Sequence, residues 1–210
     1  MFRNRTEAAQ QLAQRLNGYT DENPLVLAIP RGAVPMGRII ADALYGDLDV
    51  VLVHKLGAPG EPELAIGAVS EDGHVFVGEN ARRIGVSREY IEREADRQLQ
   101  VLTERREMYT PDRKRVDPAD RTVIVVDDGV ATGATMMAAL DAVRQAVPKR
   151  LIVAVSVAPR RTLNKLLDAA DDVICLEVPE TFVAVGQAFR EFGPVTDEDV
   201  VRILRSEHEA

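Results

Sequence analysis

The sequence has a single cysteine, no long apolar run and fewer basic than acidic residues. Cys175 excludes an intramolecular disulfide, and its apolar neighbours Val173, Ile174 and Leu176 predict a buried thiol. No stretch of about 18 apolar residues is present, which argues against a transmembrane helix. The net charge of −8 argues against nucleic acid and against an anionic membrane surface as partners.

Several catalytic signatures are also missing. The chain has no CxxC, HExxH or GxSxG pattern and no Walker lysine motif, so a metalloprotease, an α/β-hydrolase and a P-loop protein have no support. The amino-terminal stretch MFRNRTEAAQQLAQ lacks the apolar centre of a signal peptide, and we therefore expect a cytoplasmic protein. The length of 210 residues predicts one domain, 1–210.

The chain does have an apolar strand followed directly by two acids and a loop of small residues. The stretch Thr122–Thr135 reads TVIVVDDGVATGAT. Its apolar run Val123–Val126 predicts a central strand that is buried on both faces. Asp127 and Asp128 follow, and small and hydroxyl-bearing residues then lead into a helical pattern from Met136.

This order of strand, loop and helix start favours an anion site. Backbone N–H groups and the positive end of the helix dipole converge there, Gly133 permits close approach, and Thr132 and Thr135 can add O–H donors. The acids cannot bind phosphate, because like charges repel, but they suit sugar hydroxyls or a divalent metal. Taken singly, the acids could be an ordinary strand end and the loop a helix cap. Their conjunction predicts a ligand with a phosphate beside a ribose.

The same stretch resembles the phosphoribosyl-pyrophosphate (PRPP) motif of the type I phosphoribosyltransferases. It has that motif's four apolar residues, two acids and a short loop closing on Thr-Gly-x-Thr. The resemblance implies an α/β fold with a central, mostly parallel sheet flanked by helices and a small flap or hood. It implies that Asp127 and Asp128 hold the ribose hydroxyls and Mg²⁺. It also implies a 5′-phosphate cradle formed by Ala131, Thr132, Gly133, Ala134 and Thr135.

A second strand, loop and helix lie near the amino terminus. Leu25–Ile29 predicts a core strand, and Met36–Leu44 predicts a helix with Pro35 near its first position. The loop between them contains Pro30, Arg31, Gly32 and Ala33. A plain tight turn would explain this loop by itself. The resemblance implies instead a pyrophosphate loop, which in the family often contains an unusual cis peptide, with Arg31 as a cationic contact.

A third strand, predicted over Asp49–Val53, ends at His54 and Lys55. Adenine-type members of the family carry an Arg-Lys pair at this strand end. The resemblance therefore implies that Lys55 contacts pyrophosphate, whereas His54, in place of the arginine, supplies little charge when neutral. A solvated strand-end lysine is the ordinary alternative for Lys55.

The next stretch, Leu56–Glu63, has two glycines and two prolines and predicts a mobile loop, followed by a β-hairpin over residues 64–77. The resemblance implies a catalytic loop that closes over PRPP, in which Glu61 or Glu63 accepts a proton from the attacking nitrogen. Both acids could instead be solvated loop charges. We expect a flap over about residues 56–115, including a long polar helix over Arg88–Met108 that packs on the core or on a second subunit.

Alternating strands and helices, among them the strands Leu151–Val157 and Val173–Val178, predict a parallel sheet with ligands beyond its carboxyl edge. Arg160 and Arg161 precede a helix and could be solvated, or could contact phosphate or another subunit. Pro179–Pro194 holds three of the five phenylalanines. Core packing is one explanation, and the resemblance implies another, a hood whose wall for the acceptor base is formed by Phe182 and Phe189. Thr196 is expected to cap a final helix with Asp199 at its capping-box position.

The sequence thus predicts a phosphoribosyltransferase that uses PRPP, Mg²⁺ and a nitrogenous base or amine, releases pyrophosphate and forms a homodimer. Alanine at position 131 is more like the adenine and orotate enzymes than those acting on hypoxanthine and guanine, which keep an acid there. Two alternatives stay open. The protein could bind PRPP as a regulator without turnover, or it could hydrolyse or transfer another phosphorylated ribose.

Overall fold

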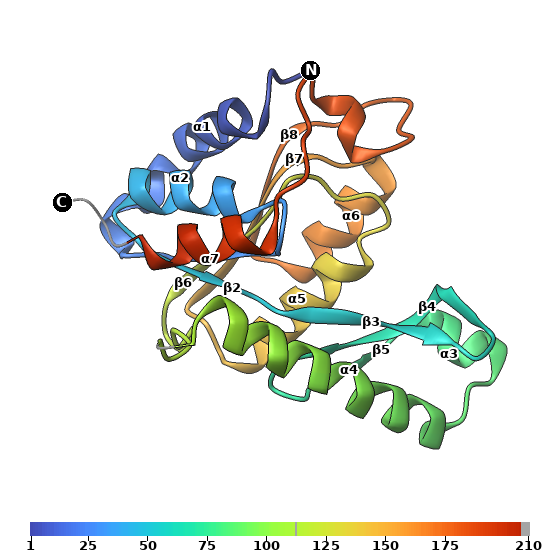
Figure 1. The fold of residues 1–210 in the computed structure, drawn as a ribbon. Helices are drawn as coiled ribbons and strands as arrows, with labels where there is room; N and C mark the ends of the chain where they lie inside the picture. Colours follow the sequence, from blue (N-terminus) through green and yellow to red (C-terminus); the bar gives the residue numbers. More distant parts are fainter. Residues whose placement is uncertain (112, 207–210) are drawn as a thin grey trace.

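The computed structural model describes residues 1–111 and 113–206 and places a five-stranded sheet at the centre of the fold (Figure 1). The strand order is β2-β1-β6-β7-β8, and every pairing is parallel. The strands are β1 Leu25–Ala28, β2 Asp47–Val50, β6 Thr122–Asp127, β7 Arg150–Val157 and β8 Asp172–Glu177. Because they are parallel, their carboxyl ends share one edge, as the sequence predicts.

Alternate residues of β6 face two separate apolar clusters, so the strand is buried on both sides. Ile124 and Val126 pack with residues of α1, α2 and α7, whereas Val123 and Val125 pack with residues of α5 and α6. These helices are α1 Arg5–Leu16, α2 Val34–Leu44, α5 Ala134–Gln145, α6 Arg160–Ala169 and α7 Asp197–Arg205. The unbroken β-branched run is thus explained by helices on both faces of the sheet.

A second, antiparallel sheet has the order β3-β4-β5 and projects from the core sheet (Figure 1). Its strands are β3 Val53–Ala58, β4 Glu61–Ser70 and β5 Val75–Val77. Two helices follow it, α3 Glu79–Ile84 and the long α4 Arg88–Tyr109, which runs along the sheet. The expected hairpin and the long helix predicted over Arg88–Met108 are both confirmed, and the side chain of Ser87 caps the helix by accepting the N–H of Tyr90.

Arg106 anchors α4 to the core. Its guanidinium contacts Glu71 at 2.6 Å, the fully buried Asp49 at 2.8 Å and the carbonyl of Val50 at 2.8 Å. Arg113 also reaches Asp49, at 3.3 Å, and Arg115 reaches Glu71, at 4.0 Å. Shielded carboxylates of this kind resist separation from Arg106, because taking a charge away from its partner inside the protein is costly. The second sheet and α4 are therefore attached to the core sheet at the end of β2.

Three expectations about this region are wrong. The strand predicted over Asp49–Val53 ends at Val50, and β3 begins at Val53, so His54 and Lys55 lie inside a strand of the second sheet. Leu56–Glu63 is not an irregular loop, because only Pro59 and Gly60 lie outside β3 and β4. Strands do not alternate with helices throughout, because β3, β4 and β5 follow one another directly.

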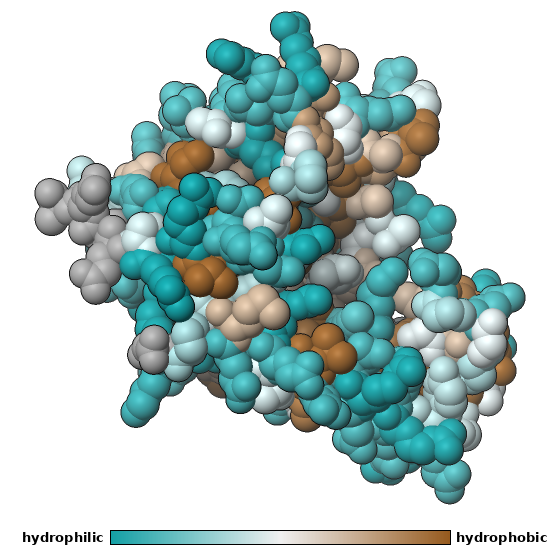
Figure 2. Space-filling model, viewed as in Figure 1, coloured by the Kyte–Doolittle hydropathy of each residue, from teal (hydrophilic) through white to brown (hydrophobic). Residues whose placement is uncertain are grey.

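The surface seen in Figure 2 is mostly hydrophilic, with apolar residues scattered over it rather than joined into one large patch. No helix among residues 1–111 and 113–206 is long and apolar enough to cross a membrane.

Candidate active site

Two carboxylates stand at the edge where the parallel strands end. Asp127 is the last residue of β6, Asp128 follows it, and both residues are half-buried. The backbone N–H of Asp128 donates to Asp127 Oδ1 at 2.8 Å, which fixes the first carboxylate against the turn of the chain.

The surroundings of this pair disfavour two bare negative charges. Burial raises the pKa of Asp127 well above its ordinary value, and the Asp128 carboxylate raises it further. Burial also raises the pKa of Asp128, and the nearby Arg5 opposes that shift. Adjacent, partly desolvated carboxylates gain stability from a cation or from hydrogen-bond donors. The pair therefore suits a ligand that brings hydroxyl groups, a metal ion or both.

Arg5, at the start of α1, already supplies one cation. Its Nε and Nη2 atoms each lie 2.8 Å from Asp128 Oδ2, and both side chains are 14% exposed. Sequence analysis missed this residue, because an arginine in an amphipathic amino-terminal helix carries no signal for a contact made 123 residues away.

The loop after β1 packs directly against Asp128. The peptide bond between Pro30 and Arg31 in this loop is cis. A Cβ atom at Gly32 would lie 2.2 Å from Asp128 Oδ2, so only glycine allows the loop backbone to approach the carboxylate this closely. The structure thus brings the loop of residues 30–33 and the acid pair together at one edge.

The loop after Asp128 leads into α5 with open backbone donors. Gly133 has φ 86° and immediately precedes α5, which begins at Ala134, two residues before the predicted start. The first turn of a helix has backbone N–H groups without intrahelical partners, and α5 has no side-chain cap to occupy them. Thr162 of α6 donates to the carbonyl of Ala131 at 2.6 Å, which ties this loop to the neighbouring helix.

Arg31 extends from its loop to the C-terminal helix. Its Nη1 lies 3.3 Å from Asp197 Oδ2, and both side chains remain partly exposed, at 52% and 37%. Tyr109 of α4 donates its hydroxyl to the same aspartate. Burial and Asp197 together raise the pKa of Tyr109, so this phenol remains a donor. Asp197 thus links the loop of Arg31 to the long helix.

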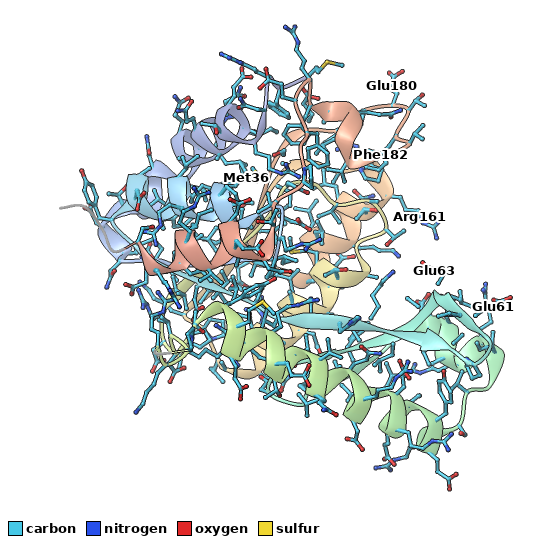
Figure 3. The ribbon with its side chains drawn as sticks, viewed as in Figure 1. Met36, Glu61, Glu63, Arg161, Glu180 and Phe182 are labelled. Atoms are coloured by element: carbon cyan, nitrogen blue, oxygen red, sulfur yellow. The ribbon has the colours of Figure 1, made fainter. Side chains whose placement is uncertain are left out.

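Lys55 and the two candidate bases belong to the projecting sheet. Lys55 is exposed on β3 and pairs with Ala68 of β4, rather than standing at the edge of the core sheet. Glu61 and Glu63 are exposed at the start of β4. Figure 3 shows both on the side of the second sheet that faces Arg161, with Glu63 nearer to that residue than Glu61 in this view.

The phenylalanines of the segment Pro179–Pro194, which we call the hood, have different surroundings. Phe189 is 6% exposed and lies between Phe2 and Phe192, with ring centroids 5.6 and 4.9 Å away. This packing assigns Phe189 to the core, contrary to the prediction that it lines a base site. Phe182 is half-buried instead.

Phe182 lines a cavity of about 450 Å³ that lies beyond the ends of β7 and β8. Arg160 and Arg161 line the same cavity, together with Glu180. In Figure 3, Arg161, Phe182 and Glu180 lie on one side of the molecule, above the second sheet. Thr162, the next residue of α6, bonds to the carbonyl of Ala131, so the helix whose first two residues line this cavity is tied to the small-residue loop.

The acid pair also fits a magnesium ion. Mg²⁺ prefers oxygen ligands and is usually bound by one or two carboxylates, with waters and substrate phosphates completing its coordination. Within the described residues there is no cluster of three or more histidine, cysteine or acidic side chains suited to a metal. An ion at Asp127 and Asp128 would take its remaining ligands from water or from a substrate phosphate.

A family profile matches this chain over nearly its whole length. The profile of the phosphoribosyl transferase domain covers residues 2–190, including β1, the acid pair, the small-residue loop and most of the hood. The chain belongs to the phosphoribosyl transferase domain family. The fold predicted from the PRPP motif is thereby confirmed at the level of the family.

Individual relatives agree with this assignment. Two proteins from strains of Mycobacterium tuberculosis, provisionally described as phosphoribosyl transferases, are 37% identical over 212 residues, covering 99% of this chain and 47% of theirs. The chain thus spans about half the length of these curated relatives. A crystal structure of a protein from Thermus thermophilus is 47% identical, with a TM-score of 0.87 and 97% coverage of both chains.

A more distant likeness is to a purine phosphoribosyltransferase from Pyrococcus horikoshii. The two chains are 14% identical with a TM-score of 0.46, over 86% of this chain and 93% of the other. A likeness this remote does not indicate which acceptor the present chain uses.

Proposed function

We propose that this protein transfers the 5-phosphoribosyl group of PRPP to a nitrogenous acceptor and releases pyrophosphate. The observation that supports it most strongly is the close approach of Gly32 to Asp128. It places the loop expected to bind pyrophosphate against the acids expected to bind ribose. A single ligand that carries both groups on adjacent atoms fits that arrangement.

Each part of PRPP then has a partner of suitable chemistry. Asp127 and Asp128 accept hydrogen bonds from the ribose hydroxyls. The 5′-phosphate lies on the N–H groups and hydroxyls of Ala131, Thr132, Gly133, Ala134 and Thr135. Pyrophosphate lies on the backbone of Pro30, Gly32 and Ala33, with Arg31 within reach as the cation. Mg²⁺ bound at the acids would neutralise part of the pyrophosphate charge.

The protein's contribution to the reaction is mainly orientation and charge stabilisation. The acceptor nitrogen forms a bond to C1 of the ribose, and the electron pair of the breaking C–O bond leaves with pyrophosphate. Arg31 and Lys55 stabilise the negative charge that develops on that oxygen. Glu61 or Glu63 accepts the proton that the attacking nitrogen loses. For these acids and for Lys55, the second sheet must lie over bound PRPP.

The acceptor lies in the cavity beside Phe182, because α6, whose first two residues line this cavity, is bonded through Thr162 to the small-residue loop. Phe182 offers a flat apolar wall, and Arg160 and Arg161 add two positive charges to the same cavity, against the one negative charge of Glu180. These features favour a flat, heterocyclic acceptor that bears an acidic group. An acceptor panel should therefore contain pairs that differ only in that group, such as orotate with uracil and nicotinate with nicotinamide.

Two alternatives make different predictions. A PRPP-binding regulator needs the ribose and phosphate contacts but no leaving-group chemistry, and a hydrolase or transferase of another phosphorylated ribose would not require PRPP. A screen of PRPP-dependent pyrophosphate release over purines, pyrimidines and small amines separates them. We expect release with at least one acceptor, and Lys55→Ala should abolish it while PRPP binding is retained. Tight PRPP binding without release on any acceptor would favour the regulator.

The assembly and the setting of this activity are also proposals. We infer a homodimer in a cytoplasmic setting, consistent with the acidic charge and with the long polar helix α4.

A further inference from the structure

Arg5 makes a second set of contacts, with the hood, besides its contact with Asp128. Its Nη1 donates to the carbonyl of Gly193 at 2.7 Å, and its Cζ atom lies 3.8 Å from the centroid of the Phe192 ring. A guanidinium at this distance over an aromatic face is attracted by the ring electrons. One side chain therefore contacts a carboxylate, a carbonyl and a ring at the same time.

The hood is otherwise attached to the amino-terminal segment that precedes Arg5. Phe2 donates its N–H to the carbonyl of Ala188 at 2.7 Å, and the N–H of Arg190 donates to the carbonyl of Phe2 at 2.9 Å. The N–H of Glu191 donates to the carbonyl of Arg3 at 2.9 Å. The segment and the hood thus form one layer, and Arg5 connects this layer to Asp128 at the end of β6.

A third contact joins the hood to Gly129, which lies between Asp128 and the small-residue loop of residues 131–135. A Cβ atom at Gly129 would lie 2.5 Å from the side chain of Val185, so the hood and the chain after Asp128 are already in close contact. A small shift of the hood would change the space between Phe182 and the acid pair. The connection through Arg5 opposes such a shift.

We propose that Arg5 is a positioning residue that keeps the hood in a fixed position relative to Asp128. Phe182, the proposed wall of the acceptor site, then faces the ribose. The proposal rests on the proposed function, because it assigns the ribose to Asp128 and the acceptor to the hood. Arg5 itself touches neither the acceptor nor the reacting atoms; it acts through Asp128, Phe192 and Gly193. A planar guanidinium makes all three contacts at once, whereas a lysine ammonium is a compact point charge that cannot reach the carboxylate, the carbonyl and the ring together.

Lysine and glutamine substitutions separate these contacts. Arg5→Lys keeps a positive charge at Asp128 but cannot keep the ring and carbonyl contacts at the same time, so we expect the PRPP Kd to stay within about threefold while the acceptor KM rises about tenfold or more. Arg5→Gln loses all contacts and should weaken both. Arg3→Gln is the matched control, because Arg3 also reaches a hood residue, Glu191, but at 3.9 Å and with 74% of its side chain exposed.

A second variant approaches the same link from the hood. Phe192→Leu removes the ring under Arg5 and leaves Asp128 untouched, so it should raise the acceptor KM and spare PRPP binding. Because the two side chains touch, the acceptor KM of the double variant Arg5→Lys/Phe192→Leu should differ strongly from the value obtained by multiplying the two single increases. A KM equal to that product would show that Arg5 and Phe192 act independently and that Arg5 does not act through the hood.

Hydrogen exchange gives a readout that needs no turnover. In Arg5→Gln the backbone amides of residues 186–193 should exchange about tenfold faster than in the wild type, because opening of the hood then costs less. Arg3→Gln should leave them unchanged. If the wild type binds PRPP but transfers it to nothing, the proposed function fails, while the exchange experiment still tests Arg5. Equal exchange and equal acceptor KM in Arg5→Gln and Arg3→Gln would overturn the positioning role.

Discussion

Replacing Asp127 by asparagine should weaken PRPP binding and stabilise the fold at the same time. The side chain is nearly isosteric, and its amide oxygen can still accept the N–H of Asp128 that now donates at 2.8 Å. What disappears is the negative charge at the strand end. Loss of a charge-assisted hydrogen bond costs about 1.5–3 kcal/mol, so the Kd for PRPP should rise roughly 10- to 150-fold.

The gain in stability follows from the pKa shift. Burial and Asp128 raise the pKa of Asp127 in the folded protein above its value in the unfolded chain. The folded protein then binds more protons between those two values, so its stability falls as the pH rises through that window and stays reduced at pH 7.5. Asp127→Asn removes this penalty. Each kcal/mol gained should raise the Tm by about 2–4 °C in a domain of this size.

Calorimetric titration with PRPP and Mg²⁺ measures the first effect, and thermal unfolding at pH 5 and pH 7.5 measures the second. Asp141→Asn is the control, because Asp141, in the second half of α5, pairs instead with His74 of the turn between β4 and β5, at 2.6 Å. It should not change the Kd for PRPP. An Asp127→Asn protein with unchanged affinity, or with a lower Tm at pH 7.5, would refute the reasoning about this carboxylate.

Three further outcomes are expected. Glu61→Gln or Glu63→Gln should lower kcat roughly 10²- to 10⁴-fold with an unchanged Kd for PRPP, and wild-type turnover in both variants would place the base elsewhere. Asp197→Asn should strengthen PRPP binding by up to about fivefold in calorimetry, because it frees Arg31 from an exposed ion pair that competes with pyrophosphate; weaker binding would contradict this. Burial, Arg105 and Lys55 lower the pKa of His54, against the opposing charge of Glu94, so the contribution of His54 to stability should be lost as the pH falls below 6.5. His54→Gln should show a smaller loss in urea unfolding, and equal losses would contradict the assignment.

The core of the fold was predictable because its signals are local. An unbroken apolar run marks a strand covered on both faces, and Thr196 with Asp199 forms the expected capping box at the start of α7. The acid pair and the small-residue loop are contiguous in sequence, so their meeting needs no long-range information. The sequence places Gly32 in the predicted pyrophosphate loop. Its approach to Asp128, however, depends on the pairing of β1 with β6.

The second sheet was misread because turn residues also occur inside twisted strands. Gly57 and Pro62 are typical of a loop, yet both lie in paired strands. A glycine is needed at position 57 because β3 and β4 approach closely there, and a Cβ atom would lie 2.7 Å from Pro62. Asp197 and Tyr109 carried no signal for their link to Arg31, because they lie far from it in sequence and meet it only after folding. Contacts of this kind depend on tertiary packing rather than on local pattern.

A structure of the protein with bound PRPP and Mg²⁺ would show whether one ligand occupies both loops and the acid pair. We expect a single PRPP that spans the site, with its ribose hydroxyls on Asp127 and Asp128, its 5′-phosphate on residues 131–135 and its pyrophosphate on residues 30–33. Binding of PRPP away from the acid pair, or with its pyrophosphate directed away from Gly32, would contradict it.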